Sequence, residues 1–343
     1  MNDVDVVVAG GGPVGLACAI EAARRGLSVT VVEPRPGPVD KACGEGLMPG
    51  AVAALDRLGV QPSGMPFRGI SYVAGRATAR HAFRSGPGLG VRRTELHQAL
   101  SRGADELGVG RLAAKVEEVS QDDGSVRVAG LTASWLLACD GLHSTVRRRL
   151  GLDPPPVPAH VRRYGLRRHA AVAPWSDYVE VHWSPLAEAY VTPVAPDLVG
   201  VALLTSTSAP YDVLLAQVPT LRSRLDGVTW ATPLRGCGPL HQPVARRRAG
   251  RVLLVGDAAG YVDALTGEGI RTGLACAEAA VAAVAAGRPA AYEADWRRLT
   301  RSYRILTRGL LASTRPQLVR RHVAGAAQRL PAVFGLAVEA LAG

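Results

Sequence analysis

The stretch that decides the fold is Val6-Val7-Val8-Ala9-Gly10-Gly11-Gly12-Pro13-Val14-Gly15, close to the N-terminus. An apolar, β-branched run leads into a glycine turn, and an alanine-rich helical pattern follows over residues 14–25. Gly10, Gly12 and Gly15 have the G-x-G-x-x-G spacing. These glycines allow a tight turn, a close approach of a pyrophosphate and close packing of helix on strand. The phosphates would lie at the helix N-terminus, where free N–H groups attract anions.

A second β-branched run, over residues 28–32, ends in Glu33, the acid expected to hold ribose hydroxyls. Pro13 inside the turn, and Arg35 in the proline-rich loop after Glu33, are further candidate contacts of the cofactor. The alternative is an ordinary glycine-rich turn between a strand and a helix. That alternative does not account for Glu33, and the stretch therefore predicts a dinucleotide site in an α/β protein.

The composition is that of a folded protein rich in arginine. A chain of 343 residues can bury a large core and form one or two domains. The formal charge is +11, and lysine occurs only at positions 41 and 115. Arginine pairs well with phosphates and carboxylates, which fits an anionic ligand, although a high-GC codon bias also explains an excess of arginine. The arginine clusters lack interleaved aromatic residues, which argues against nucleic-acid binding.

The five cysteines are widely spaced and form no C-x-x-C pair, so the sequence predicts neither a metal site nor a disulfide framework. Reduced thiols fit a cytoplasmic protein. The N-terminus lacks the basic region of a signal peptide, and no apolar run reaches the ~18 residues of a membrane span. We therefore expect no stable membrane insertion, while the sequence leaves the oligomeric state open.

Two later apolar runs resemble the first strand. Residues 135–139 predict a buried parallel strand that ends at Asp140-Gly141, and residues 252–255 predict another that ends at Gly256-Asp257. Residues 67–83 alternate like a hairpin that turns at Gly75. A proline cluster over 154–158 marks a boundary. Four runs after it look like successive antiparallel strands: 164–172, 178–183, 188–193 and 198–204.

Three motifs occur in a fixed order: the glycine turn, the stretch Asp140-Gly141-Leu142-His143-Ser144-Thr145-Val146-Arg147, and Gly256-Asp257-Ala258-Ala259-Gly260. Together they resemble the FAD-dependent group that includes para-hydroxybenzoate hydroxylase and the geranylgeranyl reductases. The resemblance covers residues 1 to about 285. It implies one FAD, bound without a covalent link. Only one dinucleotide fingerprint is present, so the resemblance implies that NAD(P)H visits transiently as the reductant or that another donor supplies the electrons.

The resemblance implies a role for individual residues. The three glycines of the turn would hold the pyrophosphate, Glu33 the adenosine ribose and Asp257 the ribitol hydroxyls, for which a carboxylate is a good acceptor. Arg93, three residues before Leu96, fits the place of an FAD-contacting arginine better than Arg92 does. The other implied contacts are Asp140 and Gly141 near the pyrophosphate, Gly256 beside Asp257, and the turn from Gly267 through Gly269 to Ile270 against the isoalloxazine.

An alternative role stays open for two of these residues. Asp140 and Asp257 can also be helix N-caps, and the two roles can coexist. The family usually has proline just before the turn at residue 267, whereas this sequence has Ala264.

The loop Cys43-Gly44-Glu45-Gly46 lies where the geranylgeranyl reductases carry a cysteine and glycines beside the flavin. Cys43 is a candidate thiol in contact with flavin or substrate, or merely a small loop residue, because a cysteine is reactive only in an electropositive, partly exposed place. Glu45 could protonate or orient the substrate, which would need a raised pKa. A solvated loop glutamate is the commoner case.

The expected fold is a Rossmann-like FAD-binding domain over 1–155 and 245–285, with an inserted antiparallel β-sheet for the substrate over 65–90 and 156–244. C-terminal helices follow over 286–343, broken by prolines at 289, 316 and 331. These helices fit a packed pair, an apolar lid or a peripheral membrane contact. Aromatic and histidine residues alternate in the inserted sheet and could face a pocket, or simply belong to a half-buried sheet: Tyr164, His169, Tyr178, His182, Trp183 and Tyr190. For the two histidines of this sheet, His169 and His182, a structural role is commoner than a catalytic one.

The leading hypothesis is an FAD-dependent monooxygenase of secondary metabolism that hydroxylates an aromatic or polyketide-like small molecule. The compact length and the aromatic second sheet favour it. The alternative is a reductase of isoprenoid C=C bonds, favoured by Cys43 and the turn at Gly267 and Gly269. A flavin-binding protein without catalysis is a weaker third class. The cofactor supplies the chemistry in each enzyme, and the protein sets access and electrostatics.

Overall fold

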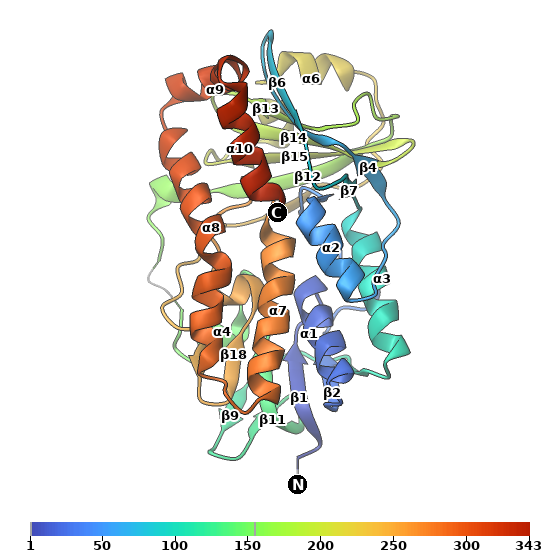
Figure 1. The fold of residues 1–343 in the computed structure, drawn as a ribbon, viewed down its shortest axis with the longest axis vertical. Coiled ribbons are helices and arrows are strands. Elements are labelled where there is room, and N and C mark those ends of the chain that lie inside the picture. The colour runs from blue at the N-terminus through green and yellow to red at the C-terminus, as the bar shows by residue number, and fades with distance from the viewer. Residues whose placement is uncertain (1, 154–155) are drawn as a thin grey trace.

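The computed structural model describes residues 2–153 and 156–343. Two sheets lie one above the other along the long axis of the molecule (Figure 1). The N-terminal strand lies at one end, and the C-terminus lies near the level where the two parts meet (Figure 1). The predicted boundary at prolines 154 and 155 lies outside the described residues.

The first sheet has eight strands, with the path β17-β18-β11-β1-β2-β8 and with β10 and β9 following β11 on a side branch. β1 (Val4–Ala9) pairs in parallel with β2 (Val29–Val32) and with β11 (Leu131–Ala138), which pairs in parallel with β18 (Val252–Leu254). The buried parallel strands predicted around residues 135–139 and 252–255 are therefore confirmed. The shorter strands are β8 (Gly110–Leu112), β9 (Val119–Gln121), β10 (Val126–Val128) and β17 (Arg248–Ala249).

Three helices cover this sheet and hold the glycine turn in place. α1 (Pro13–Arg24) packs against α7 (Gly269–Ala285) and α3 (Arg93–Glu106). α1 and α7 are both rich in alanine, and small side chains let two helices approach closely. Because the parallel strands all point the same way, their carboxyl ends meet at one edge of the sheet, where ligands bind in folds of this kind.

The second sheet has seven strands in the order β16-β12-β15-β14-β13-β5-β6. Its strands are β5 (Gly69–Ala74), β6 (Ala77–Ala82), β12 (Tyr164–Ala170), β13 (Val179–Trp183), β14 (Ala187–Ala195), β15 (Leu198–Thr205) and β16 (Arg235–Cys237). The predicted hairpin and the four successive strands are confirmed. One detail differs from an all-antiparallel sheet: β13 and β5 pair in parallel. These two strands come from distant segments, so no hairpin fixes their relative direction.

The remaining short elements lie between the two sheets or at their margins. A three-stranded sheet contains β3 (Gly46–Leu47), β7 (Gly88–Gly90) and β4 (Met65–Phe67). The short helices are α2 (Pro49–Arg57), α4 (Thr145–Arg149), α5 (Tyr211–Leu215), α6 (Pro219–Arg224) and the 3-10 turns η1 (Ala159–Val161) and η2 (Gly256–Ala259).

The C-terminal helices are α8 (Ala291–Ser313), α9 (Gln317–Arg329) and α10 (Pro331–Ala342), which agree with the predicted proline breaks. α8 packs along α7, while α9 and α10 pack on β5 and β6 (Figure 1). α9 and α10 also contact each other, so the packed pair, one of the predicted alternatives, is found. No helix in residues 2–153 and 156–343 has the length and apolar character needed to cross a membrane.

A buried ion cluster joins α9 to the second sheet. Glu188 of β14 is 1% exposed and accepts hydrogen bonds from Arg163 at 2.8 Å and Arg320 of α9 at 2.6 Å. Arg163 also donates to the buried Asp263 at 2.9 Å. Two cations and two anions thus share one desolvated site, which binds four segments of the chain together.

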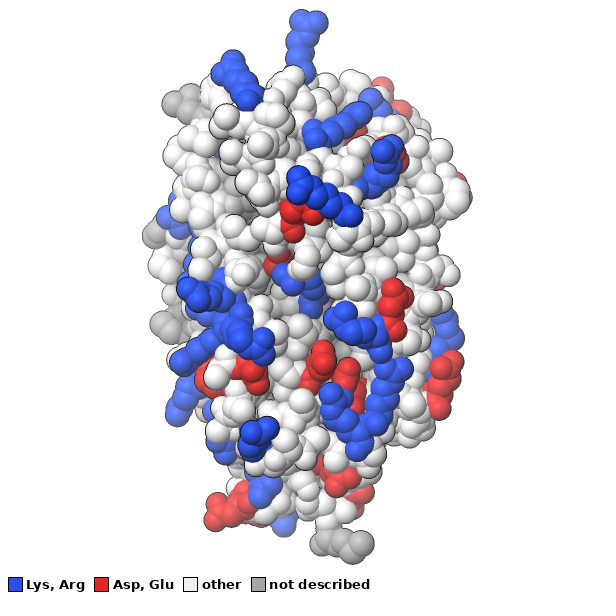
Figure 2. All heavy atoms as spheres, in the orientation of Figure 1, with Lys and Arg blue, Asp and Glu red and all other residues white. Residues whose placement is uncertain are grey.

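Charged side chains on the face shown in Figure 2 are mixed in sign: the blue arginines and lysines lie in small groups among red carboxylates. This pattern differs from the continuous basic stripe of a nucleic-acid interface.

Candidate active site

The glycine turn after β1 has the geometry of a phosphate-binding loop. A Cβ at Gly10, whose φ is +101°, would lie 2.6 Å from the carbonyl oxygen of Cys139, and a Cβ at Gly15 would lie 1.9 Å from that of Gly10. A Cβ at Gly12 would meet nothing within 4 Å. The turn therefore packs tightly on the sheet side and is open above Gly12, where α1 begins at Pro13. An anionic group fits this open side of the helix N-terminus.

Glu33 lies directly after β2, beside the turn, as the sequence predicts. Its carboxylate accepts hydrogen bonds from the Gly11 amide at 2.9 Å and from the Arg35 side chain at 2.7 and 2.9 Å. Burial alone would raise the pKa of Glu33, but these hydrogen bonds outweigh it and lower the pKa, which keeps the group ionised. The same residues border a cavity of about 500 Å³, the Glu33 cavity, which His97 and Arg111 also line.

Arg35 has a role that the sequence did not indicate: it is the partner of Glu33. The backbone amide of Arg35 also donates to the Glu33 carboxylate, at 3.1 Å. Arg35 and the Gly11 amide together therefore occupy the acceptor sites of both carboxylate oxygens. Ribose hydroxyls can reach Glu33 only when the Arg35 side chain turns away. That side chain is 57% exposed, so water can take over its hydrogen bonds when it turns away from Glu33.

A second space, the central cavity, has a volume of about 420 Å³ and extends from the glycine turn to the second sheet. It brings together twelve of the predicted site residues: Gly12, Pro13, Arg35, Cys43, Glu45, Arg93, Asp140, Gly141, Asp257, Gly267, Gly269 and Ile270. Four others lie outside its lining: Gly10 and Gly15 inside the turn, Glu33 at the Glu33 cavity, and Gly256 at a smaller pocket. Of the two arginines weighed at the start of α3, Arg93 lines the cavity and Arg92 does not.

Asp140 follows β11 and is nearly buried. One carboxylate oxygen accepts from the Val146 amide at 3.0 Å, and the other has no hydrogen-bond partner in the described part of the chain. Burial raises the pKa of Asp140. The N-cap of α4 is Ser144, whose hydroxyl accepts from the Arg147 amide, so Asp140 supports the first turn of α4 without being its cap residue. Its second oxygen is buried and would accept a hydrogen bond from a ligand donor placed beside it.

Asp257 lies in η2, and its alternative role as a helix cap is not found, because η2 begins after Val255 without a side-chain cap. Its carboxylate lies 3.6 Å from the ammonium of Lys41 across the central cavity. Both side chains are about one-third exposed. The carboxylate can therefore accept further hydrogen bonds from a ligand that enters between the two charges.

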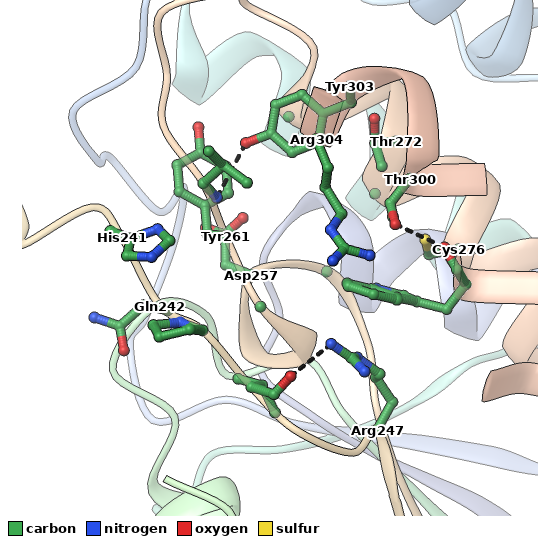
Figure 3. A pocket seen from close by; sticks show the side chains of 18 of the residues that line it. His241, Gln242, Arg247, Asp257, Tyr261, Thr272, Cys276, Thr300, Tyr303 and Arg304 are labelled. Carbon is green, nitrogen blue, oxygen red and sulfur yellow. Dashed lines mark hydrogen bonds between the residues drawn. The ribbon is translucent and has the colours of Figure 1, made fainter. Parts of the chain in front are cut away.

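Behind Asp257 lies a smaller pocket of about 100 Å³, seen in Figure 3. The Arg247 guanidinium stacks 3.6 Å from the centre of the Trp296 ring and donates to the carbonyl of Ala259 at 3.2 Å. Arg304 points towards the same space (Figure 3). This stacked arrangement fixes the backbone of η2 and thereby the position of Asp257.

Replacing Asp257 with alanine is expected to weaken FAD binding about tenfold or more. The change removes a charged acceptor whose hydrogen bonds contribute roughly 1.5–3 kcal/mol, and ~1.4 kcal/mol is one decade in affinity. The dissociation constant can be measured by titrating the apoprotein with FAD and following flavin fluorescence. Asp123→Ala, an exposed change in the β9–β10 turn, is the control, and equal affinities for the two variants would contradict this role.

The loop with Cys43 and Glu45 differs from expectation in one respect. The solvated glutamate considered for position 45 is wrong: Glu45 is 3% exposed and lies 2.6 Å from Nε2 of His169. The thiol of Cys43 is half-buried and accepts from the Glu45 amide at 3.4 Å. Both side chains line the central cavity, together with a second thiol, Cys237. Burial raises the pKa of Cys237, which keeps it a neutral thiol.

The turn at residue 267 is shorter than expected. Gly267 has φ +71°, but Gly269 and Ile270 are already the first residues of α7. Between them, Glu268 is buried and pairs with Arg271 at 3.0 Å. Ala264, which replaces the usual proline, lies in the cavity wall. The amino end of α7 therefore faces the cavity.

The aromatic lining predicted for the second sheet is found only in part. Of its six aromatic and histidine residues, only Tyr190 lines the central cavity, where its hydroxyl donates to the carbonyl of Leu265 at 2.7 Å. Tyr72 and Tyr261 join it from other segments. Most of the wall beyond the flavin motifs is aliphatic: Leu47, Met48, Ile70, Val179, Val181, Leu204, Leu240, Leu265, Val338 and Leu341.

Sequence reasoning missed several polar residues of the site. Lys41 was noted only as one of two lysines, and that rarity was the available signal. Structural roles were favoured for His169, yet it is 1% exposed and touches a cavity-lining carboxylate. Its partner is 124 residues away in the chain, so no local pattern could reveal the pair.

Known proteins share these features. A model of the family described as FAD binding domain matches residues 3–191. The chain belongs to this FAD-binding family. It is 30% identical over 330 residues to the menaquinone reductase of Mycolicibacterium smegmatis, covering 85% of this chain and 79% of that protein. It is also 30% identical over 307 residues to digeranylgeranylglycerophospholipid reductase 1 of Methanopyrus kandleri, covering 80% and 78%.

The fold of this FAD-dependent oxidoreductase has close structural neighbours. The crystal structure of p-nitrophenol 4-monooxygenase from Pseudomonas putida superposes with a TM-score of 0.79 at 21% identity and covers 100% of this chain and 99% of that one. Hydroxylases and reductases are thus built on one architecture. FAD is the cofactor of this family, and the glycine cradle and the free oxygen of Asp140 fit it.

Proposed function

We propose that this FAD-dependent oxidoreductase reduces a C=C bond of an isoprenoid-like substrate. The observation that carries the proposal is the predominantly aliphatic wall of the central cavity beside the Cys43–Glu45 loop. An extended, branched hydrocarbon gains free energy when it leaves water for such a wall, at about 25 cal/mol per Å² of apolar surface. Similarity to menaquinone and digeranylgeranylglycerophospholipid reductases over most of the chain supports this choice.

The proposal divides the chain by role. Residues 1–155 and 245–285 would bind FAD, and residues 65–90 and 156–244 would bind the substrate, with the C-terminal helices completing the wall through Val338 and Leu341. Gly12 and Pro13 would hold the pyrophosphate, Glu33 the ribose, and Asp257 the ribitol hydroxyls. NAD(P)H is proposed as the transient reductant. When bound, FAD would supply the hydride that adds to the double bond.

The residues at the far end of the flavin motifs would position the substrate and exclude water. The side chains of Cys43 and Glu45 face the cavity next to the amino end of α7. The Cys43 thiol would contact the alkene, and the Glu45 carboxyl would hold a proton near it. Tyr190, whose hydroxyl is bound to the carbonyl of Leu265, would present its ring edge to the substrate rather than a free hydroxyl.

Cys43→Ala tests the proposal. For a reductase that positions the alkene with this thiol, we expect turnover to fall at least tenfold while FAD content stays normal, because the residue lies beyond the flavin-binding motifs. Product from a prenylated naphthoquinone and from a geranylgeranyl ether lipid should be measured with and without oxygen, using NAD(P)H as donor. Cys237→Ala, which removes the other cavity thiol, is the matched control.

Two results would contradict the reductase. One is oxygen-dependent product that survives Cys43→Ala, and the other is no reduced product under anaerobic conditions. The first result would favour the second candidate, a monooxygenase of an aromatic compound. One observation favours that candidate: Tyr72, Tyr190 and Tyr261 give the cavity a partly aromatic wall. The similarity in fold between this chain and p-nitrophenol 4-monooxygenase is compatible with both the reductase and the monooxygenase.

A further inference from the structure

Glu45 has a backbone conformation that side chains rarely adopt. Its φ is +61°, and among the described non-glycine residues only Ala129 shares a positive φ. Such conformations persist where the surrounding structure enforces them, and they cluster at functional sites. Here the unusual backbone turns a buried carboxylate into the wall of the central cavity. A loop that only connected two elements would have no need for this arrangement.

The carboxylate of Glu45 is the inner end of a hydrogen-bonded chain. One oxygen accepts from the backbone amide of Arg93 at 2.8 Å, and the other lies 2.6 Å from Nε2 of His169. On the other side of the ring, Nδ1 of His169 lies 2.9 Å from the hydroxyl of Thr232. Thr232 is half-buried, and its neighbours on both sides in the sequence are exposed. The chain therefore runs from the cavity to the protein surface.

Arg167 fixes the direction of these hydrogen bonds. Its guanidinium lies 3.2 Å from Nδ1 of His169 and can only donate. Nδ1 must therefore accept, and the proton of the neutral ring resides on Nε2, where it is donated to Glu45. The Thr232 hydroxyl can then donate to Nδ1. His169 and Thr232 thus each hold a proton that is directed along the chain towards Glu45.

Other charged groups surround the pair. Arg167 pairs with Asp40, lies 3.6 Å from Glu45 and donates to the carbonyl of Lys41 at 3.2 Å. Asp40 also pairs with Arg235 at 3.1 Å. The remaining titratable neighbours are Cys43 and Arg93. Gly200 leaves room for the pair, because a Cβ there would lie 3.1 Å from the Glu45 carboxylate.

We infer that Glu45, His169 and Thr232 form a proton relay between the central cavity and solvent. The inference rests on the proposed reduction of a C=C bond, which consumes one hydride and one proton. The π bond breaks, one carbon takes the hydride, and the other takes the proton of the Glu45 carboxyl. Glu45 then takes the Nε2 proton of His169, whose Nδ1 takes that of Thr232, and the hydroxyl is restored from solvent. This step leaves the ring protonated on Nδ1 beside Arg167, so the ring must rotate and exchange its proton with solvent to return to the Nε2 tautomer.

In this relay Glu45 is the catalytic residue, because it faces the substrate, while His169 and Thr232 are positioning residues that act through it. His169→Gln keeps a side chain that can hydrogen-bond but cannot pass a proton, and Thr232→Val removes only the hydroxyl at the surface end. The second variant keeps the inference testable if the first one folds poorly.

The matched control is His182→Gln. His182 is also a buried histidine of the second sheet, paired with Glu180 at 3.0 Å, but it does not line the central cavity. With the prenylated naphthoquinone as probe, we expect kcat of His169→Gln to fall about a hundredfold, within the usual range for general acid catalysis. KM and FAD content should stay near those of the control. The pH profile of kcat should change in His169→Gln and Thr232→Val but not in His182→Gln.

A measurement without turnover separates this inference from the proposed function. In ¹⁵N-histidine-labelled protein, the His169 signal, assigned by its loss in His169→Gln, is expected to show the Nε2-protonated tautomer and to shift in Glu45→Gln. A ring protonated on Nδ1, or a pH profile of His169→Gln equal to that of His182→Gln, would overturn the relay. If the wild-type protein reduces neither probe while the tautomer is as expected, the proposed function fails and the hydrogen-bonded pair stands.

Discussion

Gly15→Ala is expected to unfold the N-terminal turn and abolish FAD binding. The new methyl group would lie 1.9 Å from the carbonyl oxygen of Gly10, a backbone atom of a residue whose amide is bound to the carbonyl of Val32 at 2.8 Å. No side chain can give way there, so α1 must move off the sheet. Overpacking of a core costs roughly 1–3 kcal/mol, and a backbone clash of this depth should exceed that range. Urea denaturation of the apoprotein measures the loss of stability.

Two glycine-to-alanine controls make this prediction specific. At Gly12 a Cβ would meet nothing within 4 Å, so Gly12→Ala should fold normally but bind FAD at least about tenfold more weakly, because the methyl group occupies the space for the pyrophosphate. Gly309 lies in α8 with open space around it, so Gly309→Ala should lower neither the stability nor the FAD affinity. Normal stability of Gly15→Ala would contradict the packing described for the turn.

Glu188→Ala is expected to lower the free energy of unfolding by roughly 3–5 kcal/mol, the usual cost of breaking a buried ion pair. The variant leaves Arg320 without its carboxylate in a site where that arginine is only 6% exposed, and leaves Arg163 with Asp263 alone. α9 should therefore loosen from the second sheet. The loss can be measured by chemical denaturation and, locally, by faster amide hydrogen exchange in α9.

The control for this change is Glu117→Ala, an exposed glutamate that forms no ion pair among the described residues. It should alter stability by less than about 0.5 kcal/mol, as surface substitutions usually do. If Glu188→Ala were as mild, water would have to reach the cluster, which would contradict the burial of Glu188.

Sequence patterns predicted the features that depend on neighbouring residues. Gly10, Gly12 and Gly15 indicated the turn because their spacing reflects local backbone needs. Continuous apolar runs indicated the parallel strands of the first sheet, and alternation indicated the hairpin of the second, since both patterns are local properties of the sequence. Asp257 was placed at the end of a buried strand for the same reason, and it lies there.

The features that the sequence did not reveal depend on contacts between distant segments. The parallel pairing of β13 with β5 joins strands more than ninety positions apart. The burial of Glu45 against His169 requires both the FAD-binding sheet and the second sheet to be in place. The aromatic residues of the second sheet show that sequence alternation does not determine which side chains line a cavity. Alternation placed Trp183 and Tyr190 in strands, but only the packed structure determines which of them borders the cavity.

The order in which the chain visits its two sheets has a consequence for anyone who wishes to dissect the protein. The chain begins in the first sheet with β1 and β2, enters the second with β5 and β6, returns for β8 to β11, leaves again for β12 to β16, and comes back for β17 and β18. No single cut therefore separates the two sheets, because any fragment that keeps the whole second sheet also carries strands of the first. Because each sheet closes only when remote segments meet, folding must wait for non-local contacts, which are slow to form. Expression of separate halves should give aggregation-prone chains with unpaired strand edges, whereas the intact chain can pair every central strand.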